Sequence, residues 1–327
     1  MHILITGAGG FVGSHMVEHI IRKTTWDIVC IDMLSYASKG WSRLKDSGVY
    51  YSPRVKCLTW NLEMPLPQGM IQEIGDVNII IHMGAISHVD YSIKNPVETI
   101  RNNVMSTVNL LEYARTLKNL KAFQYFSTDE TFGRCPKGMS YKEWDPHRPT
   151  NPYSASKAAS EDICLAYHNT YNVPVLVTNL MNCYGEMQLS LNFIPKVIRR
   201  LKNDEVIDIH TEADGITSGS RFYIHARNVA DATLFILEKG TPGEKYNIRG
   251  SREVTNLELA QRIATIMGKE LKYNLVCNCE DRPNHDDRYC LSGEKLEKMG
   301  WTPPVDFNQS LEHTVKWTLQ HPKWLED

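Results

Sequence analysis

The sequence predicts a doubly wound α/β fold, in which helices cover both faces of a parallel β-sheet. Three observations predict it: a glycine-rich turn between a strand and a helix near the N-terminus, apolar runs of strand length that alternate with helical segments, and polar residues directly after several strands. Alternating strands and helices favour parallel sheets with right-handed crossovers. Ligands of such sheets bind beyond the carboxyl ends of the strands, so these polar residues are the candidates for a functional site.

The first element is a short apolar strand over residues 2–6, followed at once by the turn Gly7-Ala8-Gly9-Gly10-Phe11-Val12-Gly13. Apolar residues at 12, 16, 17, 20 and 21 then recur with helical spacing. Strand, glycine turn and helix are the context that a dinucleotide-binding fingerprint requires, whereas a glycine triplet alone would be weak. Glycines permit the tight turn and let backbone N–H groups approach a pyrophosphate at the helix N-terminus. We therefore assign five residues to cofactor binding: Gly7, Gly10, Phe11, Val12 and Gly13.

The second predicted strand, residues 27–31, ends at Asp32, 19 residues after Gly13. A carboxylate at this position accepts hydrogen bonds from a ribose 2′-hydroxyl and would repel a 2′-phosphate. The sequence of this Rossmann-type unit therefore favours NAD over NADP.

The candidate catalytic groups lie farther along the chain. Thr128, Asp129 and Glu130 follow a predicted strand over 122–126, and Tyr153 and Lys157 share one face of a predicted helix over 153–171. An ammonium beside a phenol favours the phenolate and lowers a pKa that starts near ~10, which would make Tyr153 a base for a sugar hydroxyl. The two carboxyl groups supply a second acid/base pair, as elimination of water requires. Each pair also has a non-catalytic interpretation. Tyr153 and Lys157 could be a surface pair on a helix, and Asp129 and Glu130 could be carboxylates that stabilise the start of a helix.

The remaining pattern continues the alternation. We expect residues 1–180 to form the dinucleotide-binding domain and residues 181–327 to form a smaller, mixed α/β substrate-binding lobe that is interleaved with it, because 222–252 contains a strand that returns to the sheet. The further predicted elements are strands over 77–83, 173–179 and 245–248, and helices over 104–117, 256–267 and 293–299.

Composition excludes several classes of protein. A chain of 327 residues that is 42% hydrophobic and 23% charged is ordinary globular material, and a net charge of −2 gives no electrostatic case for nucleic-acid or membrane binding. No apolar run approaches the ~20 residues of a membrane-spanning helix. Because the first residues enter a strand that the fold needs, we expect no signal peptide and a cytoplasmic enzyme. The eight cysteines show no C-x-x-C pair, so we expect reduced thiols and no metal site.

These residues and motifs together resemble the extended short-chain dehydrogenases/reductases, and specifically the nucleotide-sugar 4,6-dehydratases of the dTDP-glucose type. The resemblance runs nearly end to end and is carried by residues 7–14, 32–37, 84–93, 128–130 and 281–289. It implies that Ala85 contacts the cofactor and that the following residues bind the nucleotide sugar: Ser87, His88, Asn182, Arg221, Arg282 and His285.

The resemblance also implies a mechanism and an assembly. Tyr153 would take the C4 hydroxyl proton while NAD accepts hydride from C4, Thr128 would bond the C4 oxygen, and Lys157 would tune Tyr153 and hold the cofactor ribose. Glu130 would then remove the C5 hydrogen, Asp129 would protonate the leaving C6 hydroxyl, and hydride would return to C6. Related enzymes pair through a four-helix bundle, which predicts a homodimer formed by the helices over 104–117 and 153–171.

The sequence departs from the family pattern at several positions. Ile86, Tyr91, Phe132 and Glu186 replace an acidic residue, an arginine, a tyrosine and a proline, and Asn61 stands where an aspartate is common. Because of these departures, the sequence does not identify the sugar, or whether the nucleotide is dTDP, UDP or another. The alternatives are a nucleotide-sugar 4-epimerase, a UDP-glucuronate decarboxylase, or a non-enzymatic NAD-binding protein on the same scaffold. The first two share the glycine turn and the Tyr–Lys pair but not the Asp-Glu after Thr128.

Overall fold

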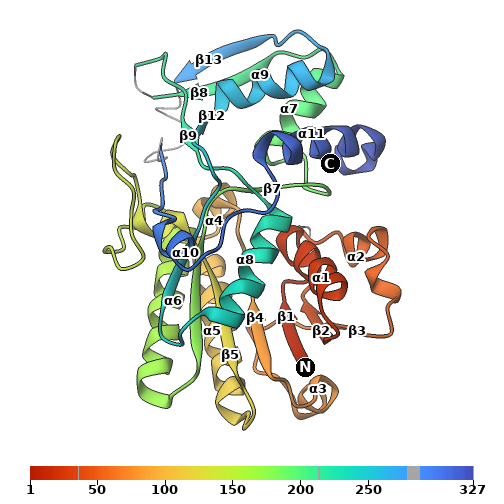
Figure 1. Ribbon diagram of the computed structural model, residues 1–327, viewed down its shortest axis with the longest axis vertical. Helices are drawn as coiled ribbons and strands as arrows, with labels where there is room; N and C mark the ends of the chain where they lie inside the picture. The colour runs from red at the N-terminus through yellow and green to blue at the C-terminus, as the bar shows by residue number, and fades with distance from the viewer. Residues whose placement is uncertain (36, 213, 278–287, 327) are drawn as a thin grey trace.

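A computed structural model describes residues 1–35, 37–212, 214–277 and 288–326 of the chain. Its centre is a seven-stranded sheet in the order β11-β6-β5-β4-β1-β2-β3 (Figure 1), and every neighbouring pair of strands is parallel. The predicted doubly wound α/β class is therefore confirmed. The strands are β1 (His2–Thr6), β2 (Asp27–Asp32), β3 (Val55–Thr59), β4 (Ile79–His82), β5 (Ala122–Thr128), β6 (Val175–Leu180) and β11 (Lys245–Ile248).

Helices cover both faces of this sheet. Alternate residues of one strand point to opposite faces, so Ile3 and Ile5 of β1 pack in one apolar core and Leu4 packs in the other. The first core lies beneath α1 (Phe11–Lys23), α2 (Ser42–Asp46) and α8 (Ala226–Lys239). The second lies beneath α3 (Gln68–Ile74), α5 (Pro96–Thr116) and α6 (Pro152–Tyr171), and α4 (Val89–Lys94) packs against α5 and α6.

A smaller lobe lies beyond one end of the sheet (Figure 1). Its apolar core is formed by residues such as Ile194, Ile209, Leu259 and Leu311. The elements around it are α7 (Phe193–Lys202), β8 (Ile207–Thr211), α9 (Asn256–Met267), β13 (Tyr273–Cys277) and α11 (Phe307–Gln320), and β8 pairs with β13 in parallel.

Short elements connect the lobe to the sheet. β7 (Cys183–Tyr184) pairs with β10 (Ile224–His225), β9 (Ser220–Arg221) pairs with β12 (Val254–Thr255), and α10 (Glu294–Lys298) packs beside β11. Three 3₁₀ turns complete the described structure: η1 (Val49–Tyr51), η2 (Asp129–Phe132) and η3 (Pro322–Trp324). The chain leaves the sheet after β6 and re-enters it at β11, where β11 pairs with β6. The division into domains at residue 180 remains a prediction.

Two findings concern the predictions from composition. Among the described helices, none combines the length and the apolar character needed to cross a lipid bilayer. Six cysteines are free thiols, whereas Cys277 is disulfide-bonded, so the expectation of reduced thiols is wrong at that position.

Candidate active site

The glycine turn has no room for side chains. Gly7 has a φ of +69°, and a Cβ there would lie 2.8 Å from the backbone of Gly84. A Cβ on Gly13 would lie only 2.1 Å from the Gly7 carbonyl oxygen. Helix α1 begins after Gly10, which offers no side-chain cap to the first N–H groups. An uncapped helix N-terminus of this kind can hold a phosphate, so the turn fits a dinucleotide.

Asp32 lies beside this turn at the end of β2. Its Oδ2 accepts a hydrogen bond from the Gly9 N–H at 3.0 Å, and its Oδ1 accepts one from the Leu34 N–H at 2.8 Å. The side chain is 8% exposed, and burial raises its pKa above the ordinary value. The two backbone bonds fix the orientation of the carboxylate at the carboxyl end of the strand, where the sequence places a ribose partner.

A cleft of about 320 Å³ runs along the carboxyl ends of the central strands. The cleft is lined by every residue that the sequence analysis assigned to the cofactor, namely Gly7, Gly10, Phe11, Val12, Gly13, Asp32, Ala85, Tyr153 and Lys157. Ser87, a predicted substrate residue, lines the cleft as well. The structure therefore brings the glycine turn and the Tyr–Lys pair into one cleft.

Thr128, Asp129 and Glu130 follow β5 and begin the turn η2. The Thr128 hydroxyl lies 3.1 Å from Asp129 Oδ1 and is also a hydrogen-bond partner of Tyr153. Asp129 is 5% exposed, and burial raises its pKa to about 6, although the charge of Arg221 acts in the opposite direction. Near neutral pH this carboxyl group can therefore both hold and release a proton, as a general acid must.

Glu130 is held by the residue that caps the helix of Tyr153. Asn151 is the N-cap of α6 and forms a capping box with Ser154, and its Nδ2 donates to Glu130 Oε2 at 3.2 Å. The carboxylate and the phenol thus come from two elements that meet at Asn151.

The electrostatics of Tyr153 differ from the prediction. The pKa of the phenol is raised above its ordinary value, first by burial and then by the negative charge of Glu130. Lys157 Nζ lies 4.3 Å from the centroid of the Tyr125 ring, and burial lowers the pKa of Lys157 to about 8. The expected lowering of the Tyr153 pKa by Lys157 is therefore not found in this structure, where the Lys157 ammonium lies over Tyr125 and burial raises the pKa of the phenol.

The predicted substrate residues are less closely grouped. Ser87 is exposed at the cleft, and His88 caps α4, where its Nδ1 accepts from the Tyr91 N–H at 3.3 Å. The Asn182 side chain is exposed beside β7. Arg221 is 7% exposed and lies over the Tyr289 ring at 4.6 Å, on the side of Asp129. Arg282 and His285 lie outside the described residues.

Two buried polar atoms at this edge have no hydrogen-bond partner within the described part of the chain. They are Ser127 Oγ, beside the cleft, and Asp129 Oδ2. Buried polar atoms are nearly always satisfied, so both are suited to a bound partner, and Ser127 Oγ lies where such a partner could approach from the cleft. In the same described residues, no group of three or more His, Cys, Asp or Glu side chains has an arrangement suited to a metal ion.

Sequence reasoning missed Arg43, which ties the walls of the cleft together. Its guanidinium is buried, and burial lowers its pKa to about 10. Nη1 donates to the carbonyls of Gly9 and Ala37 at 3.0 and 2.9 Å, and Nε donates to the Met187 carbonyl at 2.9 Å. Its short helix carries no motif, so no local signal marks this residue.

Comparison with known proteins identifies close relatives. The sequence model of the family described as GDP-mannose 4,6 dehydratase matches residues 4–314. A dTDP-glucose 4,6-dehydratase of Haemophilus influenzae is 34% identical over 340 residues, which cover 98% of each chain. A trifunctional UDP-glucose 4,6-dehydratase/UDP-4-keto-6-deoxy-D-glucose 3,5-epimerase/UDP-4-keto-L-rhamnose-reductase of Arabidopsis thaliana is 32% identical over all of this chain and 48% of its own length.

A solved structure agrees with these matches. The crystal structure of a dTDP-glucose 4,6-dehydratase from Streptomyces venezuelae, with NAD and TYD bound, superposes with a TM-score of 0.89 at 31% identity. The superposition covers 100% of this chain and 99% of that one. Fold, length and sequence therefore agree over the whole chain.

Proposed function

This chain belongs to the nucleotide-sugar 4,6-dehydratase family of the extended short-chain dehydrogenases/reductases, and we propose that it converts a dTDP- or UDP-hexose of the glucose type to the 4-keto-6-deoxy sugar. It is an NAD-dependent 4,6-dehydratase. The observation that carries the proposal is the pairing of two unlike carboxyl groups beside Tyr153. Asp129 is buried with a pKa of about 6, whereas Glu130 is half-buried and accepts a hydrogen bond from Asn151.

The two carboxyl groups suit elimination of water. Glu130, as the carboxylate, removes the C5 hydrogen that a 4-keto group makes acidic. Asp129, as the neutral acid, donates its proton to the departing C6 hydroxyl. Burial raises the pKa of Asp129 to about 6, so its neutral, proton-donating form is accessible near neutral pH.

Oxidation at C4 precedes this step. NAD, when bound, supplies the hydride acceptor for C4 and the hydride that later returns to C6. Tyr153 accepts the C4 hydroxyl proton, and Thr128, its hydrogen-bond partner, bonds the C4 oxygen. Because the phenol pKa is raised by burial, Tyr153 needs a nearby positive charge to act as a base, and Lys157 lies in the same cleft. Lys157 also holds the cofactor ribose.

The remaining contacts are assigned from the sequence motifs and from the resemblance to the family. Gly7, Gly10, Phe11, Val12, Gly13, Asp32 and Ala85 hold the cofactor, and Ser87, His88, Asn182, Arg221, Arg282 and His285 bind the nucleotide sugar. The charge of Arg221 acts on Asp129, which supports a role near the sugar as well as on a phosphate.

One incubation tests the function. The protein is mixed with dTDP-glucose or UDP-glucose, and the products are identified by mass spectrometry and NMR. A 4-keto-6-deoxy sugar supports the proposal, and the better substrate names the nucleotide. An epimer would favour a 4-epimerase instead. UDP-glucuronate, tested in parallel, gives a pentose and CO₂ only with a decarboxylase, and no turnover of any substrate would favour a non-enzymatic protein.

We also propose a homodimer that acts in the cytoplasm. The outer surface of α4 and α5 carries four exposed apolar side chains, Ile93, Val97, Ile100 and Met105, with Val97 76% exposed. Apolar surface gathered on neighbouring helices favours burial against a second copy of the same helices. Pairing of α5 and α6 with their counterparts would form a four-helix bundle.

A further inference from the structure

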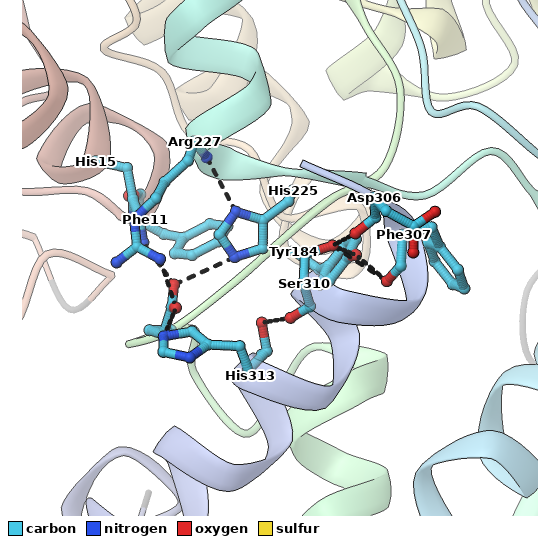
Figure 2. Close-up of polar contacts among 11 residues, drawn as sticks. Phe11, His15, Tyr184, His225, Arg227, Asp306, Phe307, Ser310 and His313 are labelled. Carbon is cyan, nitrogen blue, oxygen red and sulfur yellow. Dashed lines mark hydrogen bonds and ion pairs between the residues drawn. The ribbon is translucent and has the colours of Figure 1, made fainter. Parts of the chain in front are cut away.

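One buried carboxylate in this chain contacts side chains from four separate elements. Glu186 follows β7 and is 1% exposed. Figure 2 labels the four cationic or imidazole side chains that contact this carboxylate. We call Glu186 and these four residues the Glu186 cluster; they are His15 of α1 at 3.3 Å, His225 of β10 at 3.2 Å, Arg227 of α8 at 2.7 Å and His313 of α11 at 2.9 Å.

Hydrogen bonds tie the cluster to neighbouring segments. His15 Nδ1 lies 3.0 Å from the Phe11 carbonyl oxygen, and its Nε2 lies 3.3 Å from Glu186 Oε2. His225 Nδ1 instead accepts from the Arg227 N–H at 3.2 Å, which leaves hydrogen on Nε2, and burial lowers the pKa of His225. Burial raises the pKa of Glu186, but the His15 hydrogen bond and the nearby His225 and Arg227 groups outweigh burial and hold that pKa well below its ordinary value. His225 Nε2 lies 3.2 Å from Glu186 Oε2 without the geometry of a hydrogen bond.

The cluster is joined to the cofactor turn. Phe11 lines the cleft at the start of α1, and its carbonyl receives the His15 bond. A Cβ on Gly185 would lie 3.2 Å from His225 Nε2 and 3.4 Å from Phe11 Cζ, so the chain before Glu186 passes close to both rings.

The chain after Glu186 forms one wall of the cleft. Met187 has a φ of +63°, and its carbonyl accepts a hydrogen bond from Arg43 Nε. Nη1 of the same guanidinium donates to the Gly9 carbonyl in the glycine turn. Gln188, Leu189 and Asn192 then line the cleft. We call residues 185–192 the wall segment. Its N-terminal end is fixed by the Glu186 carboxylate on one side and by Arg43 on the other.

The proposed reaction uses no residue of the Glu186 cluster, so the cluster is not part of the catalytic machinery. A buried carboxylate adds little net stability, because the cost of removing charges from water offsets their attraction. Its specific effect is to fix geometry, since each of its partners requires one position and direction. We propose that Glu186 is a positioning residue for the cofactor: it fixes the wall segment against the glycine turn and thereby slows release of the dinucleotide.

The test is the rate at which NADH leaves the protein. The isolated protein is loaded with NADH and mixed with excess NAD⁺, and loss of the bound-NADH fluorescence gives the dissociation rate. Glu186→Gln keeps the length of the side chain but offers one acceptor where the cluster presents several donors. We expect dissociation to be about ten-fold faster, the effect of losing one charge-assisted hydrogen bond. The apparent KM for NAD⁺ should rise while kcat at saturating NAD⁺ changes less than about threefold.

A matched control separates positioning from general loosening. Glu258 of α9 binds Arg252 at 2.7 Å and Arg262 at 2.9 Å in the smaller lobe, and it does not line the cleft. Glu258→Gln should leave NADH dissociation unchanged even if the protein unfolds at a lower temperature. Equal acceleration in both variants, or dissociation within about twofold of the unmodified protein in Glu186→Gln, overturns the proposal.

A second variant covers the case in which Glu186→Gln does not fold. His313 is 57% exposed on α11, lies 2.9 Å from Glu186 Oε1, and is not among the residues that line the cleft. His313→Gln should accelerate NADH release by about two- to fourfold, and an unchanged rate counts against the proposal. The inference rests on the assignment of NAD to the cleft. An unmodified protein that binds no NADH would refute that assignment, whereas normal NADH binding with unaffected variants refutes only the role of Glu186.

Discussion

Asn151 Nδ2 lies 3.2 Å from Glu130 Oε2, so the residue that caps the Tyr153 helix also orients the proposed C5 base. Asn151→Ser separates the two roles, because serine caps a helix but its shorter side chain cannot reach Glu130. We expect Asn151→Ser to unfold within about 0.5 kcal/mol of the unmodified protein, yet to exchange the C5 hydrogen with solvent deuterium several-fold more slowly. Asn151→Ala should lose about 1 kcal/mol as well. Normal exchange in Asn151→Ser would show that the bond does not orient the base.

Tyr153 and Glu130 should act at different steps. Glu130→Gln should still oxidise C4, accumulate bound NADH and fail to exchange the C5 hydrogen. Tyr153→Phe should lose both signals by a factor of about 10² or more if it is the general base. Absorbance at the NADH band and mass spectrometry in deuterated buffer report the two signals. Release of 4-keto-6-deoxy product by Glu130→Gln at a near-normal rate would favour the epimerase or decarboxylase alternatives.

Asp129 predicts a pH dependence with a definite sign. Its pKa is raised from 3.8 to about 6, so the folded protein favours the neutral acid. That stabilisation is fully present below pH 3.8 and is lost as the pH rises through about 6. Asp129→Asn should therefore be more stable than the unmodified protein at pH 7 to 8, by an amount on the order of 3 kcal/mol, and the advantage should vanish near pH 4. Denaturant unfolding at several pH values measures the difference, and a constant difference would refute the shift.

The elimination step should follow the same titration. If neutral Asp129 donates the proton to the C6 hydroxyl, the rate of elimination falls as the pH rises above about 6. Single-turnover measurements of the loss of the C6 oxygen at several pH values check this decrease in rate. A rate that stays flat up to pH 9 would assign the acid to another group.

Asp32 should set the preference for NAD. Asp32→Ala removes both the proposed ribose contact and the charge that repels a 2′-phosphate, so it should weaken NAD binding and narrow its advantage over NADP by about tenfold. Titration calorimetry with each cofactor measures both affinities. Asp32→Asn is the control that removes the charge and keeps an acceptor for the Gly9 N–H. Equal affinity of the unmodified protein for NAD and NADP would refute the assignment.

The dimer can be tested with one exposed residue. Val97 on α5 is 76% exposed, and Ile216 in the smaller lobe is 74% exposed. Val97→Glu would place a charge in the proposed helix bundle and should shift the protein to monomers at micromolar concentration. Ile216→Glu, a matched change outside the bundle, should leave the mass in solution unchanged. A monomeric mass for the unmodified protein would contradict the proposal outright.

The sequence predicted those parts of the fold that local patterns control. Glycine spacing and apolar runs located β1, β2, β4, β5 and β6 to within a few residues. Helix α5 begins at Pro96 rather than at the predicted residue 104, because its first turns carry an exposed apolar surface that breaks the expected stripe. Strand β3 was not predicted, because its residues do not form a strongly apolar run. Its strand structure depends on pairing with β2.

Contacts between distant segments could not be predicted in the same way. Arg43 and Glu186 meet their partners only after the chain has folded, and nothing in their neighbouring residues distinguishes them from surface charges. We expected the Lys157 ammonium beside the Tyr153 phenol, but it lies over the Tyr125 ring. Helical spacing shows that two residues share a face, but it does not fix the direction of a long side chain. The degree of burial, which controls the pKa values of Asp129 and Tyr153, likewise depends on the whole fold.

The late return of the chain to the sheet has a consequence for biosynthesis. Strand β6 ends at Leu180, but its outer neighbour β11 begins only at Lys245. While the ribosome makes the residues between them, β6 is an open edge that can pair with a strand of another nascent chain. Premature termination anywhere in that interval would leave this edge permanently uncovered. We therefore expect such truncated products to aggregate or to be captured by chaperones, even though most of the sheet has already been synthesised.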